Sequence, residues 1–344
     1  MSTLVDRKPI VIKWPLKRLG VSGVQWKAPD IPGYVFTHDP ACAEYDWLVV
    51  YDEFPFGSGG TIRRGVERLR CPRAHTILLT QEPVALKHYG WRYTHQFGHL
   101  ITSRPPEAEN HPHYHRGQGY YVSCRGETWA ETLAWKPQKK TRLISAVCSA
   151  KAMRHTQHWQ RYALMRHLSA RIPELDWFGL GVKTIPRKRD ALDGYKYHVA
   201  AENVIAPGHW TEKISDALLS ECLPFYAGDP DLWRVLPPDC FIPIPLDDPG
   251  EAARIITEAI RNDEYARRLP AIREARRLIV EKYNTYSQII SVIEAEKDAP
   301  ATPPGPSDCI LSRHRLRWHP GEMIAEAAYR LQRTWTSIGK RSVT

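Results

Sequence analysis

Apolar residues in this chain gather in short runs that polar, glycine-rich or proline-rich segments separate. The runs at 45–51 (YDWLVVY) and 75–80 (HTILLT) are almost continuously apolar, which is typical of parallel strands buried on both faces. Residues 8–14 (KPIVIKW) and 97–102 (FGHLIT) also read as strands, and a basic amphipathic stretch at 61–70 lies between two of the runs. This alternation of strand and helix patterns predicts a doubly wound α/β sheet.

Two segments of the first half carry loop signals. The GSGG sequence at 57–60 lacks the rest of a phosphate-loop motif, so we interpret it as a flexible turn. Residues 105–119 are rich in Pro and His, with His111, His113 and His115 alternating. Alternating histidines can ligate zinc, but no matching Cys or Asp set is visible. We therefore favour a surface loop that contacts an acceptor.

The second half repeats the alternation of strand and helix patterns. Strands are expected at 139–149, 176–181, 195–203 and 223–227, and helices at 156–172, from Thr211 onward, at 251–262 and at 264–295 with an interruption at Pro270. Thr211 is a good N-cap, because its hydroxyl can accept a hydrogen bond from an amide of the first helical turn. Residues 237–248 resemble an edge strand and linker, 298–308 a Pro-rich linker, and 310–344 a basic helical tail containing Trp.

The composition of the chain indicates which binding partners and which cellular compartment to expect. The 344 residues are enough for two domains. The chain has 48 Lys and Arg against 38 Asp and Glu, and this charge of +10 suits an anionic partner or simply a basic enzyme. Seven cysteines without a CxxC pair argue against a disulfide scaffold and a zinc site. Neither a signal peptide nor an 18-residue apolar window is visible, so we expect a cytoplasmic protein.

Two positions carry candidate chemistry. Glu82 follows the strand at 75–80, at the edge where open α/β sheets bind ligands, so its carboxylate is either a general base or a solvated loop residue. Lys213 lies in the first turn of the helix that begins after Thr211. A strand that leads through a loop into a helix N-terminus is a common phosphate site, because free amides and the helix dipole point outward.

The region from 195 to 230 resembles a known family. YKYHVAAEN at 195–203 and TEKISDALLSECLPFYAGDP at 211–230 resemble the donor-binding signature of glycosyltransferase family 10, the α-1,3/α-1,4-fucosyltransferases, in which YKFxLxFEN precedes YVTEKxxxAxxxxxxPVxxG. The spacing between the two motifs matches without a gap. Upstream, residues 146–181 look like the segment SNxxxxxRxxxYxxLxxxxxVDxxG of the family, and LLTQEP at 78–83 looks like its ExP segment.

The resemblance implies a GT-B architecture, with two facing Rossmann-like domains and a C-terminal helical tail. It also implies inverting transfer of L-fucose from GDP-β-L-fucose without an essential metal or other cofactor. The domains would be an acceptor-side domain at 1–138, a nucleotide-sugar-binding domain at 139–297, and the linker and basic helix at 298–344. The acceptor would be a surface glycan such as a lipopolysaccharide O-antigen or a capsule.

The resemblance also assigns roles to individual residues. Glu82 would be the general base, and Arg161 and Lys213 would hold the diphosphate. Glu212 would accept hydrogen bonds from the ribose hydroxyls, and the pair Glu202 and Asn203 would face the donor sugar and diphosphate. The implied donor-binding residues are Arg161, Glu202, Asn203, His209, Glu212 and Lys213, with Lys196 and Trp210 as further candidates.

Some positions depart from the family pattern. Val204 replaces a Ser, and His209 and Trp210 replace Tyr-Val, all close to the donor motif. They leave nucleotide binding plausible and make another nucleotide sugar an alternative donor. Asp229 and Asp231 mimic a DxD metal motif, but they follow a glycine turn where the family has a Gly-x-Pro loop, so we expect no metal there.

Two further readings concern partners. The basic tail, with Arg and Trp, suits the inner surface of a membrane, and it equally suits a helix that packs back on the protein. The charge and the 12 tryptophans also motivate an alternative of another class, a nucleic-acid-binding protein. No nucleic-acid motif is present, so we expect a nucleotide sugar and a glycan as partners and no nucleic acid.

Overall fold

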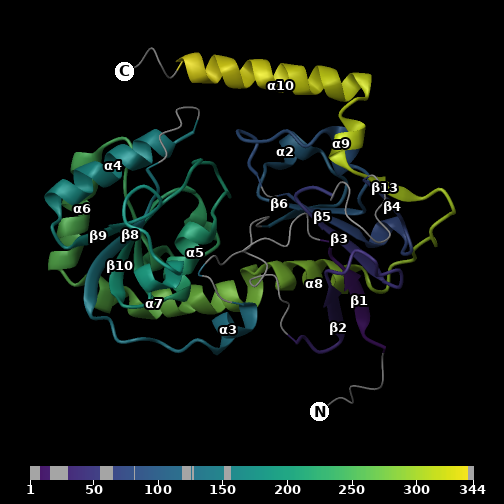
Figure 1. Ribbon diagram of the computed structural model, residues 1–344. Helices are drawn as coiled ribbons and strands as arrows, with labels where there is room; N and C mark the ends of the chain where they lie inside the picture. Colours follow the sequence, from purple (N-terminus) through teal and green to yellow (C-terminus); the bar gives the residue numbers. More distant parts are fainter. Residues whose placement is uncertain are drawn as a thin grey trace. The chain divides into compact units, whose positions relative to one another are not determined.

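The computed structural model describes residues 8–15, 30–54, 65–80, 82–117, 125, 128–150 and 156–339, with side chains up to residue 332. The chain forms two compact units. The first comprises Met1–Gly119 and Thr285–Trp335, and the second comprises Tyr120–Asn284 and Thr336–Thr344. Each unit contains a sheet of parallel strands with helices around it (Figure 1). The predicted α/β class is therefore confirmed.

The first unit is built on a six-stranded parallel sheet in the order β2-β1-β3-β5-β6-β7. Its strands are β1 (Ile10–Lys13), β2 (Tyr34–Thr37), β3 (Trp47–Tyr51), β5 (Thr76–Leu79), β6 (His99–Thr102) and β7 (Tyr114–Arg116). The four strands predicted in this half are confirmed as β1, β3, β5 and β6. Leu48, Leu78 and Leu100 are fully buried in one core cluster, which explains their continuous apolar pattern.

The helix predicted at 61–70 is wrong for the part that the structure describes. Residues 57–64 lie outside the described residues, and β4 (Val66–Arg68) follows them as a strand. It pairs antiparallel with β13 (Cys309–Leu311), which comes from the far end of the chain. Glu67 on β4 is buried and forms an ion pair with Lys13 Nζ at 2.7 Å. Because β4 is stabilised by pairing with a strand far away in the sequence, the residues around β4 carry no local pattern that predicts a strand.

The loop predicted at 105–119 is also more regular than expected. It contains α2 (Pro106–Glu109) and β7, which adds to the edge of the sheet beside β6. Residues 118–119 lie outside the described residues. The proline and histidine content suggested turns, but hydrogen bonding to β6 stabilises an extended strand there.

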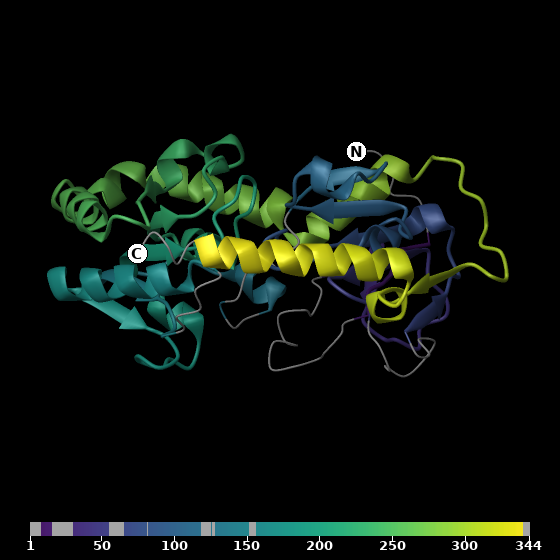
Figure 2. The same cartoon turned by 90° about the horizontal axis from the view of Figure 1, so that it is seen from above.

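Helices from the end of the chain complete the first unit. In α8 (Thr285–Glu296), the ring of Tyr286 packs edge-on against Trp14 and Phe36, with centroid separations of 5.8 and 5.2 Å. The predicted helical tail is confirmed in α9 (Arg313–Leu316) and α10 (Pro320–Gly339), although it begins with the strand β13. Figure 2 shows α10 as one continuous helix. Within the described residues, no helix is both long enough and apolar enough to span a membrane.

The second unit contains a five-stranded parallel sheet in the order β12-β11-β10-β8-β9. Its strands are β8 (Arg142–Val147), β9 (Leu175–Phe178), β10 (Tyr195–Ala201), β11 (Leu223–Ala227) and β12 (Ile242–Pro243), and its helices are α3 (Trp129–Ala134), α4 (His158–Arg171), α5 (Glu212–Leu219), α6 (Pro249–Arg261) and α7 (Glu264–Leu278). All the strands predicted here are confirmed, with β12 at the edge as expected.

The predicted break at Pro270 is wrong, because α7 continues through it. The chain leaves the helix at Asn284, whose backbone is extended.

The two compact units differ from the predicted domains at both boundaries. The segment around Trp135 belongs to the second unit, where the guanidinium groups of Arg125 and Arg276 lie 5.3 and 5.0 Å from its ring. Helix α8, predicted in the second domain, belongs to the first unit through Tyr286. Side-chain packing rather than linker composition sets these boundaries.

A buried histidine on β10 should make the stability of the second unit depend on pH. His198 Nδ1 lies 2.9 Å from Ser145 Oγ, and burial, with the charge of Lys188, lowers the pKa of His198 to about 3. The unfolded chain takes up this proton near pH 6.5, so it binds more protons than the folded chain between pH 6.5 and 3, and stability falls as the pH falls through that window. The expected slope is about 1.4 kcal/mol per pH unit.

Hydrogen exchange of peptides from β8 and β10, measured from pH 6.5 to 4.5, tests this prediction. After correction for intrinsic exchange, protection should decrease with falling pH in the native chain. The slope should flatten in His198→Gln and stay unchanged in the exposed control His319→Gln. An equal slope in all three proteins would assign the effect to another group.

Candidate functional site

The N-terminus of α5 faces the carboxyl end of β10 across a short loop. Thr211 is the N-cap, and its side chain accepts a hydrogen bond from the Lys213 amide at 3.3 Å, which confirms the predicted cap. The loop is held from the other side by Asp229, whose Oδ1 accepts from the Gly208 amide at 2.8 Å and from the Asp231 amide at 2.9 Å. The strand, loop and helix therefore form one rigid frame.

Glu202 is the buried centre of this frame. Its carboxylate accepts hydrogen bonds from the amide of Thr211 at 3.0 Å and from the Thr211 hydroxyl at 2.8 Å, and it forms an ion pair with Lys213 Nζ at 3.2 Å. The side chain of Glu202 is only 1% exposed. Its oxygens contact Thr211 and Lys213, and the expectation that Glu202 faces the donor stays a prediction.

Lys213 lies among several charges. Its Nζ is 3.3 Å from Glu212 Oε1 and 3.0 Å from the Thr211 hydroxyl. Burial works against the charge of Lys213, but Glu202 and Glu212 outweigh it and raise its pKa. Burial also opposes ionisation of Glu212, whereas Lys213 and Lys188 lower the pKa of Glu212 to about 2. Both side chains are therefore ionised at neutral pH.

Arg161 adds a positive charge with no acidic partner. Arg161 lies on α4 and is only 7% exposed, and its guanidinium donates a hydrogen bond to Asn203 Oδ1. Among the residues that the structure describes, no carboxylate forms an ion pair with its guanidinium, and its Nε has no hydrogen-bond partner. The charge of Arg161 also works against the charge of Lys213, so the two cations are neighbours. A buried cation without a counter-ion is costly unless an anion binds there.

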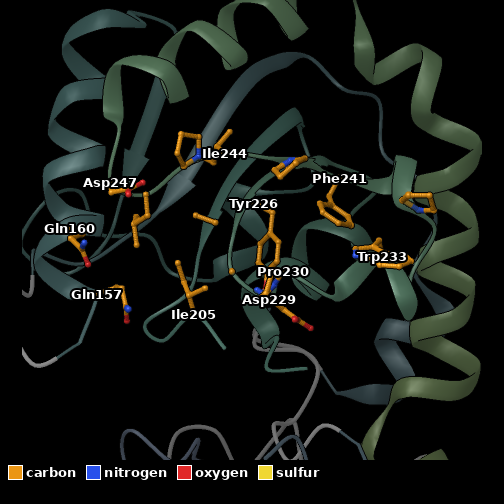
Figure 3. Close-up of a pocket in the computed structure, with 16 residues that line it drawn as sticks. Gln157, Gln160, Ile205, Tyr226, Asp229, Pro230, Trp233, Phe241, Ile244 and Asp247 are labelled. Atoms are coloured by element: carbon orange, nitrogen blue, oxygen red, sulfur yellow. The ribbon is translucent and has the colours of Figure 1, made fainter. Parts of the chain in front are cut away.

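The side chains of Arg161, Glu202, Glu212 and Lys213 form a charged cluster. A cavity of about 590 Å³ opens beside this charged cluster in the second unit. Figure 3 shows Gln157 and Gln160 on one side of it, and Phe241 and Trp233 on the other. The rest of the lining comes from the ends of β11 and β12 and from the segments around them and after β10. It consists of Ile205, Tyr226, Ala227, Gly228, Asp229, Pro230, Pro238, Pro243, Ile244, Pro245, Leu246 and Asp247.

Residues at the start of α4 contribute both to the cavity, through Gln157 and Gln160, and to the charged cluster, through Arg161. The Gln157 amide donates to the Asn203 carbonyl at 3.0 Å, and Arg161 follows Gln157 by one helical turn, with its amide donating to the Gln157 carbonyl at 2.9 Å. This position, outside the carboxyl ends of parallel strands, is where α/β sheets bind ligands. The sequence interpretation missed the cavity, although the Pro- and Asp-rich loops after two adjacent strands were a usable signal.

The remaining donor-side candidates occupy different positions. His209 and Trp210 are buried, and the ring of Trp210 packs edge-on against Tyr283. Lys196 lies near the start of β10, where its Nζ is 3.5 Å from Asp263. At about 3.3 Å per residue, that end of the strand is roughly 20 Å from Glu202. The structure therefore does not bring Lys196 to the cluster.

Glu82 belongs to the first unit and follows β5. Its amide donates to the Tyr89 hydroxyl at 3.1 Å, which in turn donates to Asp52 Oδ1 at 2.6 Å. Lys87 Nζ contacts Asp52 Oδ1 at 2.8 Å and Glu53 Oε1 at 2.9 Å. This network anchors the backbone of Glu82, whose side chain is partly exposed. Sequence reasoning identified Glu82 but missed the tyrosine that holds it.

Comparisons with known proteins relate the chain to one family. Residues 137–269 match the family model for the glycosyltransferase family 10 (fucosyltransferase) C-terminal domain. No curated protein matches the chain. Among solved structures, an α1,3-fucosyltransferase with GDP-fucose aligns with a TM-score of 0.51 and 14% identity over 89% of this chain and 96% of its own.

Two further crystal structures of α1,3-fucosyltransferase are similar. One aligns with a TM-score of 0.48 and 14% identity over 86% of this chain and 91% of its own. The other, with GDP, aligns with a TM-score of 0.48 and 14% identity over 89% and 95%. The fold with two α/β units is thus that of the GT-B fucosyltransferase with GDP-fucose. Residues 137–269, less than half of the chain, are thus similar to the C-terminal domain of glycosyltransferase family 10 (fucosyltransferase).

Proposed function

We propose that the chain transfers L-fucose from GDP-β-L-fucose to a hydroxyl group of a surface glycan, with inversion at the anomeric carbon. The observation that carries this proposal is the buried Arg161 guanidinium, which has no carboxylate partner among the described residues and neighbours Lys213. A diphosphate satisfies both cations, because the planar guanidinium can bind two oxygens and the ammonium acts as a point charge.

The adjoining cavity suits the nucleoside part of such a donor. Trp233 and Phe241 offer flat apolar faces, and Gln157, Gln160 and Asp247 offer polar groups. Ligand sites combine apolar walls with a few polar groups in this way. The family relative that shares the fold was crystallised with GDP-fucose, which supports a guanine nucleotide as the ligand.

The proposed reaction needs one base and two cations. The acceptor hydroxyl oxygen attacks the anomeric carbon from the face opposite the diphosphate, and its proton passes to the Glu82 carboxylate. The bond between the anomeric carbon and the diphosphate oxygen breaks, and the diphosphate leaves with the electron pair. Arg161 and Lys213 stabilise the charge that develops on it. Because these side chains supply the positive charge, the proposed transfer uses no essential metal.

The donor sugar and the setting are also part of the proposal. Val204, His209 and Trp210, which depart from the family motif, are all buried, so they act mainly through packing, and another nucleotide sugar remains the alternative donor. We place the enzyme in the cytoplasm, in polysaccharide biosynthesis. Helix α10 exposes Met323, Ile324 and Leu331, side chains that suit a peripheral contact with the inner membrane surface.

A thermal-shift screen against a panel of nucleotide sugars tests the donor assignment. At a concentration of one hundred times its Kd, a ligand stabilises the native state by about 2.7 kcal/mol. This corresponds to a rise of roughly 5–10 °C in the melting temperature of a unit of about 150–250 residues, the size class of the second unit. We expect GDP-fucose and GDP to produce this rise, and UDP and CMP sugars to produce little. A larger shift with another nucleotide sugar, together with its turnover, would replace fucose as the donor.

A further inference from the structure

Three side chains that are distant in sequence meet in the first unit. His99 lies on β6, His113 comes directly before β7, and Glu296 is the last residue of α8. One ring nitrogen of each histidine and one carboxylate oxygen of Glu296 all lie within 4.8 Å of one another. Within the residues that the structure describes, this is the group of His, Cys, Asp and Glu side chains close enough to share one ion.

Neighbouring groups support the central histidine. The ring of His99 hydrogen-bonds the backbone of Ala74, and its Nδ1 lies 3.1 Å from His115 Nε2. Burial, with His115 and His113, lowers the pKa of His99 to about 4, so its imidazole is neutral at physiological pH. A backbone hydrogen bond to one ring nitrogen is a usual support of a metal-binding histidine, and a metal at Nδ1 would replace the contact with His115.

We propose that His99, His113 and Glu296 bind a divalent first-row transition metal, with Zn²⁺ as the best match to two imidazoles and one carboxylate. His115 or a water molecule takes the fourth position. Zinc bonds of about 2.0–2.2 Å place tetrahedral ligands roughly 3.4 Å apart, so the atoms must approach from separations of up to 4.8 Å. His113 is exposed and Glu296 is partly exposed, and both side chains can rotate to close the gap.

The proposed ion would connect the last turn of α8 to β6 and to the start of the edge strand β7. Helix α8 comes from the C-terminal part of the chain, whereas β6 and β7 come from the N-terminal part. A metal at this junction would stabilise the first unit by fixing that long-range contact. Its ligands belong to the first unit, whereas Arg161 and Lys213 belong to the second, and its proposed role is structural.

Metal binding to the full chain, purified without a histidine tag and treated with a chelator, tests the proposal. Titration calorimetry with Zn²⁺, and elemental analysis after dialysis, should show one equivalent per chain. Co²⁺ should produce the visible absorption of a tetrahedral site. The variants His113→Ala and Glu296→Gln should each weaken Zn²⁺ affinity at least about 10-fold, whereas the exposed control His319→Ala should not.

The variants His113→Ala and Glu296→Gln should fold normally, so a loss of Zn²⁺ affinity in them can be assigned to the lost ligand. Because His113 is exposed and Glu296 is partly exposed, their replacement should leave the circular dichroism spectrum unchanged. Binding of less than one equivalent, or equal affinity in the native chain and all three variants, would overturn the proposal. The second of these outcomes would indicate an adventitious ion only, for example at a cysteine.

Discussion

Replacing Glu82 with glutamine should lower kcat for transfer from GDP-fucose by about 10²–10⁴-fold, the usual contribution of a general base. Glutamine has nearly the same shape but cannot accept the acceptor proton. The backbone anchor should persist, because the hydrogen bond to the Tyr89 hydroxyl is donated by the Glu82 amide and not by its side chain. GDP affinity should stay the same, since the proposed diphosphate ligands belong to the second unit.

Rates of GDP release in the presence of acceptor, together with calorimetric GDP binding, measure both parts of this prediction. Glu107→Gln is the matched control, because Glu107 is an exposed carboxylate of the same unit, and it should retain full activity. If Glu82→Gln lost GDP binding, or kept native turnover, the base assignment would fail.

Replacing Arg161 with glutamine should weaken GDP binding by roughly 10–150-fold, because a hydrogen bond between the guanidinium and a charged diphosphate contributes about 1.5–3 kcal/mol. The free protein should be as stable as the native chain or more stable. The reason is that Arg161 is a buried charge with no ion-pair partner among the described residues, and removal of such a charge relieves a desolvation cost.

This opposite movement of affinity and stability distinguishes a ligand-binding arginine from a structural one. Calorimetry with GDP and thermal unfolding without GDP are measured on the same samples. Arg166→Gln serves as the control, because Arg166 lies on the same helix but is exposed, and both quantities should match the native chain. A large loss of stability with unchanged GDP affinity would make Arg161 a structural partner of Asn203.

The sequence predicted the strand, loop and helix around Thr211 well because the signals for them are local. A Thr at the N-cap, the apolar face of α5 and the continuous apolar runs of β10 and β11 all involve residues within one helical turn or one strand of each other. The choice of arginine was less certain from spacing alone, because Arg166 on the same helix was an alternative. Arg161 is buried and donates to Asn203, whereas Arg166 is exposed, which is why we propose Arg161.

Other features lay beyond any local pattern. Pro270 suggested a break in α7, but the packing of Ile272 and Ala275 in the interior keeps the helix continuous through it. The alternating histidines at 111–115 indicated a loop, because Glu296, the carboxylate that lies near His113, is far along the chain. The cavity beside Trp233 likewise draws its walls from separate segments.

By itself, then, the sequence determined the α/β class, the strand, loop and helix around Thr211, and the family resemblance, because each depends on the order and spacing of nearby residues. Only the tertiary structure decided that Glu202 is enclosed by Thr211 and Lys213, that Lys196 lies at the far end of β10, and that β4 is a strand. These outcomes depend on burial and on contacts between distant segments, which exist only once the chain has folded.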